Sequence, residues 1–392
     1  MDVIAHPALT SPDASEALTR DTVIRQVKSR ILDIPTVRQH KLSNTAITHQ
    51  NYVHVELLFD NGVVGYGEAS TLGGPRWSEE SVEAIKVNID TYLAPALIGH
   101  AGVQVEAANT QLAKAAKRNF SAKSALNAAI LDALGKSLDV SVTSLLGGAL
   151  RDQISVIWAL ASGDAIQEVE EAKAKIAARQ FNRFKIKLGF ADARSDLRRL
   201  EKLRSELPSN TEIIADINQG WSEADCRKWF PALEELDLSL IEQPVDAGDI
   251  EGMARIAKDV RIPLMLDEAV FTPQEATRGV ALNAGTVLSL KLCKHGSVNA
   301  LQRIAGIATA GGLELYGGCL LESSLGAAAH LAVFASLPEL HWGCEHFGPL
   351  ILAEDTVSDS LIYEDFHVLC PTGPGLGVTP SPEAVAKYER KM

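Results

Sequence analysis

Two hydrophobic patterns divide the chain. From about residue 22 to 70 apolar and polar residues alternate, and an Asp-Asn-Gly sequence at 60–62 supplies a turn between paired strands. Alternation with a period of two is typical of half-buried β-strands. This pattern predicts an α+β block that ends near Arg151, because helical periodicity follows the strands. The predicted helical segments are 78–99, 105–119 and 122–139.

Beyond residue 151, short apolar segments alternate with amphipathic helical segments. One helix start is explicit, because Thr272, Pro273 and Glu275 combine an N-cap, a proline at the first helical position and a capping-box glutamate. Eight strand–helix units within about 200 residues predict a (β/α)8-type barrel. The predicted strands are 155–162, 184–189, 213–218, 239–244, 263–268, 287–292, 313–318 and 341–348.

The two patterns predict a division into four segments. Residues 1–21 are expected to form a flexible N-terminal arm, and residues 22–151 an α+β capping domain. The barrel is expected to occupy residues 152–354. Alternation resumes in the tail, residues 355–392, which is expected to return to the capping domain.

Composition narrows the class of protein. The chain has 392 residues, 46% of them apolar and 22% charged, as in ordinary soluble globular proteins. Its formal net charge of −13 argues against nucleic acid or an anionic membrane as a partner. The five cysteines are widely spaced, and neither a secretory signal nor an apolar run near the ~20 residues that span a bilayer is found. These features predict a cytoplasmic protein.

Ionisable residues mark the ends of five consecutive predicted strands. The intervals between them are 29, 26, 25 and 24 residues, which is one strand–helix unit each. Barrel enzymes form their active sites at the C-terminal ends of the strands, so these five side chains are expected to converge there. They are Lys187, Asp216, Glu242, Asp267 and Lys291.

Three of these five groups are carboxylates. A single aspartate after a strand is usually a turn residue or a helix cap, but three at matched positions would repel one another unless a cation lies among them. Oxygen ligands without histidine favour a hard divalent ion, Mg²⁺ or Mn²⁺, over zinc. The sequence therefore predicts a divalent metal site formed by Asp216, Glu242 and Asp267.

Lys185 and Lys187 lie one residue apart in a predicted strand, so their side chains point to the same face. On this strand alone, exposure to water would explain both. In a barrel mouth, however, they would lie on one side of the metal and Lys291 on the other. Such a like-charge pair is expected to lower the pKa of at least one lysine, which then moves protons near neutral pH. A metal that faces these lysines is suited to forming and holding an enolate.

These motifs resemble those of the enolase superfamily, and within it the muconate-lactonizing subgroup. The likeness rests on the Lys-x-Lys strand, the Ala-Asp-Ile-Asn, Ile-Glu-Gln-Pro and Leu-Asp-Glu-Ala motifs, and the later Ser-Leu-Lys-Leu motif, in order and spacing. Segments 160–164, 315–326 and 342–350 also resemble motifs of the muconate cycloisomerases. The resemblance covers nearly the whole chain and implies a barrel with an N-terminal capping domain.

The resemblance also implies a role for each residue of the expected site. Lys187 would be the general acid or base, Lys185 would keep it poised, and Lys291 would face it as a second base. Glu345 would lie beside the enolic carboxyl group. The residues implied around the metal, Mn²⁺ or Mg²⁺, are Asp216, Glu242 and Asp267 as ligands, with Asn218 and Glu268 in support.

In this subgroup the capping domain covers the barrel mouth. Segment 40–51 is expected to be a mobile lid, whose closure would exclude water from a short-lived enolate. Glu322 is equally expected to line the pocket or simply to begin a helix. The residues expected to contact substrate are Leu72, Trp77, Ser289, Glu322 and Phe347.

The implied reaction interconverts cis,cis-muconate, a dicarboxylate, and muconolactone through a metal-stabilised enolate, in the catabolism of catechol and related aromatic compounds. The resemblance implies a homo-oligomer as well, often an octamer. Trp77 stands where muconate enzymes often have tyrosine, Ser289 resembles the chloromuconate type, and Phe347 resembles the plain muconate type. Halogenated muconates therefore remain possible substrates. The sequence also leaves undetermined which lysine delivers the proton, and hence whether addition is syn or anti.

Several other functions share these residues. An N-acylamino acid racemase, a dipeptide epimerase or an o-succinylbenzoate synthase would use the same two lysines, but the epimerases usually carry Asp-x-Asp where this chain has Cys-Glu-His at 344–346. A metal-free aldolase with Lys291 as a Schiff-base nucleophile would leave three convergent carboxylates without a cation. A barrel kept only for binding would be expected to have lost part of the set, which is complete here.

Overall fold

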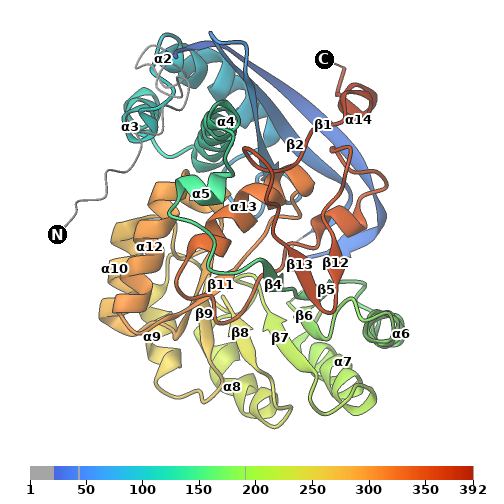
Figure 1. Cartoon of the computed structure of the whole chain (residues 1–392). Helices are drawn as coiled ribbons and strands as arrows, with labels where there is room; N and C mark the ends of the chain where they lie inside the picture. The colour runs from blue at the N-terminus through green and yellow to red at the C-terminus, as the bar shows by residue number, and fades with distance from the viewer. Residues whose placement is uncertain (1–21, 43–44, 190, 392) are drawn as a thin grey trace, which may run out of the picture.

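The computed structural model describes residues 22–42, 45–189 and 191–391. The expected N-terminal arm lies outside these residues, as do residues 43 and 44 within the expected lid. Figure 1 shows two parts, an antiparallel sheet with its helices above and a barrel of strands and helices below. In the described part of the chain, no helix combines the length and the apolar character needed to cross a bilayer.

The upper part is a three-stranded antiparallel sheet covered by helices. Its strands, in the order β1-β2-β3, are β1 (Ile24–Lys41), β2 (Ala46–Phe59) and β3 (Val64–Thr71). Helix α4 packs closely on β3, because a Cβ atom at Gly65 or Gly67 would come within 2.0 Å of a carbonyl oxygen of α4. The helical segments are α1 (Val82–Asn88), η1 (Ile89–Leu93), α2 (Ala94–Leu97), α3 (Val105–Ala115), α4 (Phe120–Leu138) and α5 (Val142–Leu145).

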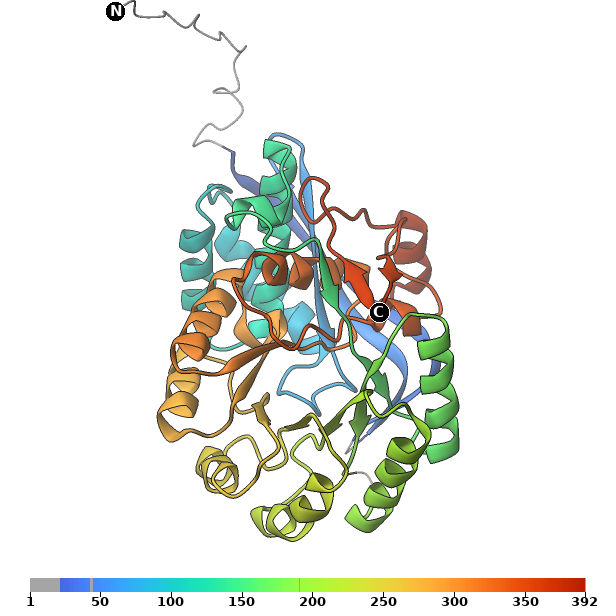
Figure 2. The same cartoon turned by 60° about the horizontal axis from the view of Figure 1, so that its bottom comes forward.

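The lower part is a parallel sheet of seven strands, in the order β11-β10-β9-β8-β7-β6-β5. The strands are β5 (Trp158–Leu160), β6 (Arg183–Lys187), β7 (Glu212–Asp216), β8 (Leu240–Glu242), β9 (Leu264–Leu266), β10 (Val287–Leu290) and β11 (Glu314–Gly317). Figure 2 shows the helices arranged around the outside of these strands. The helices of this part of the chain are α6 (Ala165–Ala177), α7 (Ala193–Glu206), α8 (Glu223–Glu234), α9 (Ile250–Ala257), α10 (Pro273–Leu282), α11 (Leu292–His295), α12 (Val298–Ala310) and α13 (Ser324–Ser336), and α11 packs against α4 of the upper part.

The predicted barrel is confirmed, but its eighth strand is reduced to a bridge. Cys344 forms parallel bridges with Val156 on one side and Gly317 on the other, and thereby joins the two edges of the sheet. The segment stays short because Gly343 adopts a φ of 65° and a 3-10 helix, η2 (Gly348–Ile351), follows. The hydrophobic pattern of 341–348 could not reveal these two interruptions.

The tail contacts both parts of the molecule. Strands β12 (Tyr363–Glu364) and β13 (His367–Leu369) form an antiparallel sheet with β4 (Gln153–Ser155). Helix α14 (Pro382–Tyr388) then lies beside β1 (Figure 1). Arg390 fixes it there, because its Nε and Nη2 donate to the Asp33 carboxylate at 2.6 and 2.7 Å.

Candidate active site

The strand register places three predicted groups at one level. Lys187, Asp216 and Glu242 are the last residues of β6, β7 and β8. Lys187 lies opposite Asp216, and Asp216 lies opposite Glu242. Asp267 and Lys291 follow directly after β9 and β10. The structure therefore brings all five groups to the C-terminal end of the sheet.

Each of the three carboxylates contacts a lysine. Lys187 Nζ donates to Asp216 Oδ2 at 2.5 Å, and Lys291 Nζ donates to Asp267 Oδ2 at 2.5 Å. Lys185 Nζ lies 2.5 Å from Glu242 Oε2, as an ion pair without hydrogen-bond geometry. All these side chains are buried. The site is thus a dense, water-excluded array of opposite charges.

Glu345 is the second carboxylate, after Glu242, that contacts Lys185. Its Oε2 is 2.5 Å from Lys185 Nζ and accepts a hydrogen bond from the Tyr316 hydroxyl at 2.9 Å, while its Oε1 accepts from the Cys319 N–H at 3.0 Å. Lys185 Nζ also lies 4.6 Å from the centre of the Tyr316 ring. Tyr316 was not predicted, although it lies within a predicted strand near the expected site and carries a polar group that needs a partner when buried.

The charges of the site do not balance within the protein. Burial, followed by the nearby Asp216, raises the pKa of Glu242 well above its ordinary value in spite of Lys185. Burial and the charges of Asp267 and Asp216 also raise the pKa of Glu268 to about 7. Carboxylates also outnumber lysines in the buried site by five to four, and these groups are Asp216, Glu242, Asp267, Glu268 and Glu345 with Lys185, Lys187, Lys291 and Lys294. An all-oxygen donor set with surplus negative charge fits a hard divalent cation.

The predicted lowering of a lysine pKa is wrong for Lys185 and Lys187. Burial alone would lower both values, but the attraction of Glu242 and Glu345 outweighs it and raises the pKa of Lys185. The charge of Asp216 likewise raises the pKa of Lys187, in spite of the repulsion from Lys185. The prediction counted the like-charged neighbour within the strand and omitted the carboxylates that other segments of the barrel bring close.

Asn218 and Glu268 lie where they were expected, next to the carboxylates. Asn218 Nδ2 donates to Glu268 Oε1 at 3.1 Å, and Asn218 Oδ1 accepts from Lys187 Nζ at 3.3 Å. The backbone N–H of Asn218 donates to Asp216 Oδ1 at 3.0 Å. Asn218 therefore links a lysine, an aspartate and a glutamate of the site.

Two buried residues of the site were missed from the sequence, Gln243 and Lys294. Gln243 Oε1 accepts from the backbone N–H groups of Asp267 and Ala269 at 3.0 and 3.2 Å. Lys294 Nζ donates to Asp267 Oδ1 at 2.9 Å. Lys294 was overlooked because it follows the strand, in a position where a lysine is usually solvated.

Residues of the capping part reach the barrel. Leu42, Ile47 and Leu72 belong to the same buried apolar cluster as the barrel strands. Trp77 packs against this cluster, and Lys291 Nζ lies 4.3 Å from the centre of its ring. The loop after β3 therefore reaches the site, and the described residues of the expected lid pack against the barrel.

Ser289 and Phe347 are buried within the barrel. Ser289 Oγ has no hydrogen-bond partner among the described residues. A Cβ atom at Gly318 would come within 2.4 Å of both Ser289 Oγ and Lys291 Cε, so this glycine allows the close approach. The Phe347 ring packs against Trp158, with 4.9 Å between ring centres.

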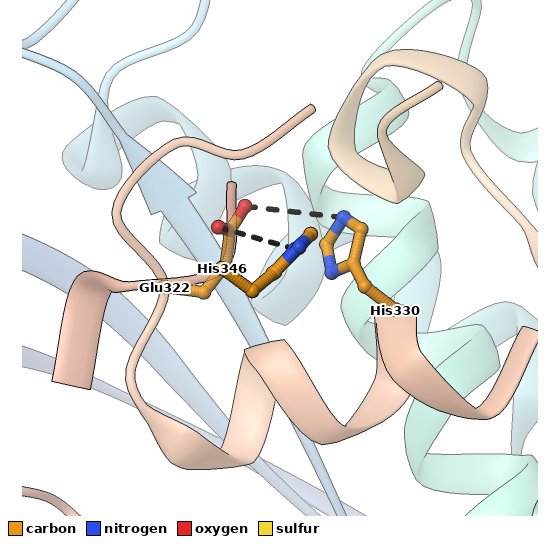
Figure 3. A group of neighbouring side chains, drawn as sticks. All are labelled: Glu322, His330 and His346. Atoms are coloured by element: carbon orange, nitrogen blue, oxygen red, sulfur yellow. Dashed lines mark ion pairs between the residues drawn. The ribbon is translucent and has the colours of Figure 1, made fainter. Parts of the chain in front are cut away.

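Glu322 lies in a second buried polar group, with His330 and His346 (Figure 3). Its carboxylate accepts hydrogen bonds from the Leu320 N–H at 3.0 and 2.9 Å and from Ser70 Oγ at 3.2 Å. It also lies 3.9 and 3.8 Å from Nε2 of His330 and His346. It does not cap the following helix, since that role belongs to Ser323.

A glutamate and two histidines at such distances resemble a metal site. Both ring nitrogens of His330, however, are engaged in hydrogen bonds. His330 Nδ1 lies 2.9 Å from the Gly326 carbonyl oxygen, to which only a protonated nitrogen donates. His330 Nε2 must then accept the hydrogen bond from the Leu292 N–H, at 2.9 Å. No lone pair of His330 is therefore left for an ion. Glu322 and His330 each hold backbone groups near this site through hydrogen bonds, whereas neither ring nitrogen of His346 has a hydrogen-bond partner among the described residues.

Two family descriptions match most of the chain. Residues 26–147 match the N-terminal domain of the mandelate racemase and muconate lactonizing enzyme family. Residues 167–384 match the enolase C-terminal domain-like family.

Proteins of similar sequence bear two related names. Chloromuconate cycloisomerase of Cupriavidus pinatubonensis is 38% identical over 367 residues, which are 94% of this chain and 99% of that protein. Muconate cycloisomerase 1-1 of Acinetobacter lwoffii is 37% identical over 367 residues, which are 94% of this chain and 96% of that protein.

Solved structures agree with this relationship. The crystal structure of a muconate lactonizing enzyme from Pseudomonas fluorescens, complexed with muconolactone, has a TM-score of 0.93 and 36% identity, and covers 94% of this chain and 100% of that one. A 2-chloromuconate cycloisomerase from Rhodococcus opacus has a TM-score of 0.92 and 35% identity, with coverage of 94% and 100%. The resemblance seen in the sequence is thus confirmed, and the chain belongs to the mandelate racemase and muconate lactonizing enzyme family of the enolase superfamily.

Proposed function

We propose that this chain is a muconate cycloisomerase, which interconverts cis,cis-muconate and muconolactone through an enolate with the help of a divalent metal. Relatives of similar sequence and fold bear this name or the chloromuconate name. One observation carries the proposal: Lys187 pairs with Asp216 and Lys291 with Asp267, both at 2.5 Å, within one buried site. Such a site offers two proton carriers beside a cluster of oxygen ligands for a metal, and enolate formation requires both a proton carrier and a stabilising positive charge.

Asp216, Glu242 and Asp267 would hold the metal, Mn²⁺ or Mg²⁺. When bound, the divalent cation supplies positive charge beside the substrate carboxylate, where negative charge grows as the enolate forms. Asn218 and Glu268 would keep the ligands in place through the hydrogen bonds that link them. The surplus negative charge of the carboxylates supports this assignment.

The lysines would handle the proton. In the lactonising direction, an oxygen of one substrate carboxylate bonds to the carbon β to the other carboxylate, and the α-carbon then takes up a proton. Lys187 or Lys291 would deliver that proton, and the choice between them decides syn or anti addition. Lys185, which pairs with Glu345 at 2.5 Å, would keep positive charge beside Lys187.

Substrate would enter when the capping part opens. The lysines and carboxylates are buried, so segment 40–51 and the loop after β3 would have to move away from the barrel mouth. Their return would shield the enolate from water. Leu72 and Trp77 would then contact the bound substrate from above, and Ser289, Glu322 and Phe347 from the barrel side.

Chloromuconates are the second candidate substrates. The relative from Cupriavidus pinatubonensis and the structure from Rhodococcus opacus both bear chloromuconate names at 38% and 35% identity. The combination of Ser289 with Phe347 leaves room for either preference. Activity toward chlorinated and plain muconate, compared as kcat/KM, decides between them.

Compartment and assembly are part of the same proposal. All five cysteines are buried and free, as suits a reducing cytoplasm. A homo-oligomer, such as an octamer, is proposed from the family alone. Size-exclusion chromatography with light scattering measures the mass directly.

The test of the reaction follows the conjugated diene. Purified protein is mixed with Mn²⁺ and cis,cis-muconate, and the loss of ultraviolet absorbance is recorded beside metal-free protein and Lys187→Ala. The expected result is a metal-dependent loss that disappears in the variant. If the folded, metal-bound protein leaves muconate unchanged, muconate is ruled out as its substrate. Deuterium uptake at the α-carbon of N-acylamino acids and dipeptides would then be measured.

A further inference from the structure

Lys294 is a fourth lysine of the site. It lies at the third position of α11, the four-residue helix that begins directly after Lys291. Its side chain is wholly buried, with 0% exposure. A buried ammonium group needs an acceptor for each of its three N–H bonds.

Lys294 finds three acceptors, and two of them belong to Asp267. Its Nζ donates to Asp267 Oδ1 at 2.9 Å, to the Asp267 carbonyl oxygen at 2.8 Å and to the Ser289 carbonyl oxygen at 2.7 Å. The lysine thus joins the end of β9 to β10 and grips both the backbone and the side chain of Asp267. Such a double contact fixes the torsions of that aspartate as well as its charge.

Asp267 is fixed from two other directions as well. Its backbone N–H donates to Gln243 Oε1 at 3.0 Å. Its second carboxylate oxygen, Oδ2, accepts from Lys291 Nζ at 2.5 Å. Lys294 therefore occupies Oδ1 and directs Oδ2 toward the side where Lys291 and the other carboxylates lie.

We propose that Lys294 is a positioning residue for the metal site: it holds the Asp267 carboxylate so that Oδ2 alone faces Lys291 and the position of the cation. The inference rests on the proposed role of Asp267 as a metal ligand. Lys291, the N-cap of α11, and Lys294, within that helix, thus take the two oxygens of one carboxylate.

A positioning role and a purely electrostatic role predict opposite results. If Lys294 acts only through its charge, its removal leaves the negative charge of Asp267 less compensated and strengthens metal binding. If it acts by orientation, its removal lets the Asp267 carboxylate turn away, and metal binding weakens. Loss of a residue that orients a ligand typically weakens metal binding by about 10- to 100-fold.

The test compares Lys294→Met with the matched control Lys123→Met. Lys123 is also buried, and its Nζ donates at 2.7 Å to the Ala116 carbonyl oxygen within the capping part. The Mn²⁺ dissociation constant of each folded protein is measured from the electron paramagnetic resonance signal of free Mn²⁺, without substrate. Thermal unfolding and muconate turnover are recorded separately.

The expected result is Mn²⁺ binding that is roughly 10- to 100-fold weaker in Lys294→Met and unchanged in Lys123→Met. Unchanged or tighter binding in folded Lys294→Met would overturn the inference. If that variant does not fold, Lys294→Gln is judged by the same criterion, because its amide nitrogen lies one bond nearer the backbone than Nζ and no longer reaches Asp267 Oδ1. Wild-type protein that binds Mn²⁺ without turning over muconate would refute the reaction but leave this inference standing. Wild-type protein that binds no Mn²⁺ would overturn both the metal site and the inference.

Discussion

The ammonium group of Lys291 lies 4.3 Å from the centre of the Trp77 ring, so a side chain of the capping part covers a lysine of the barrel. An aromatic ring attracts a cation over its face, and this attraction contributes about 0.5–2 kcal/mol. Trp77 therefore restricts where Lys291 can lie when the site is closed. The contact ties closure of the cap to the arrangement of a proposed proton carrier.

Replacement of Trp77 tests this contact. Trp77→Leu keeps an apolar side chain but removes the ring, and kcat/KM is expected to fall by about 2- to 30-fold, which corresponds to the loss of one cation–π contact. Steady-state kinetics with muconate measure the change. Trp229→Leu is the control, because Lys228 Nζ lies 4.8 Å from that ring, away from the site. Equal losses in the two variants would contradict the prediction.

Substitution of Lys187 or Lys291 is expected to lower kcat far more than substitution of a surface lysine. Lys187→Met and Lys291→Met each remove a proposed proton carrier, and the one that protonates the α-carbon should lower kcat by about 10²- to 10⁴-fold. The configuration of the deuterated α-carbon of muconolactone formed in heavy water shows syn or anti addition, and the variant that loses activity identifies the lysine that delivers the proton. Lys202→Met, which breaks a surface ion pair with Glu206, serves as the control. Full activity in both site variants would refute the proton-carrier roles.

Removal of the Ser289 hydroxyl is expected to stabilise the protein while weakening substrate binding. A buried polar atom without a partner costs about 1–3 kcal/mol, so Ser289→Ala should raise the free energy of unfolding or leave it unchanged. If the hydroxyl contacts substrate, KM should rise at the same time. Denaturant unfolding and kinetics give the two values. Ser124→Ala is the control and should be destabilised, because Ser124 Oγ donates to the Ser121 carbonyl oxygen at 2.9 Å. A less stable Ser289→Ala with unchanged KM would contradict the prediction.

Glu68 is expected to make stability depend on pH. Burial raises the pKa of this carboxyl group from 4.5 to about 8, so the folded protein keeps a proton that the unfolded chain releases. Its contribution to stability is therefore complete below about pH 4.5 and is lost as the pH rises toward 8, by up to about 1.4 kcal/mol per pH unit. Glu68 lies between the two parts of the molecule, since its Oε1 accepts from the Ser323 N–H at 3.0 Å.

The Glu68→Gln variant checks this dependence. A glutamine cannot release a proton. The free energy of unfolding of the variant, minus that of the wild type, should therefore rise between pH 5.5 and 8 and stay constant above pH 8. Urea unfolding at four pH values within and above this window measures the difference. The exposed Glu201→Gln is the control. Parallel curves for wild type and Glu68→Gln would rule out a buried carboxyl group that titrates near pH 8.

The barrel and the ionisable residues at the ends of its strands were predictable because both depend on short stretches of sequence. Each strand is a short apolar run, and Lys187, Asp216 and Glu242 each end a strand in the structure as expected. The N-cap at Thr272 was also found, since a capping box lies within four residues, and α10 begins there. Patterns that a few neighbouring residues determine can be read from the chain alone.

The features that were missed depend on residues distant in sequence. The pKa of Lys185 is raised by Glu242, on another strand, and by Glu345, which follows the bridge at Cys344. Lys294 is buried because α11 packs against α4, more than 150 positions earlier in the chain. Periodicity along the sequence carries no information about either neighbour.

The position of α14 has a consequence for recombination among relatives. The capping part is formed by two stretches of chain that flank the barrel, because α14 packs on β1 and the Arg390 N–H donates to the Ile31 carbonyl oxygen at 2.8 Å. A chimaera with a single crossover would place α14 of one parent on β1 of the other. Exchange of a complete cap between two family members therefore needs two crossovers, one on each side of the barrel, with the Asp33–Arg390 pair inherited from the same parent.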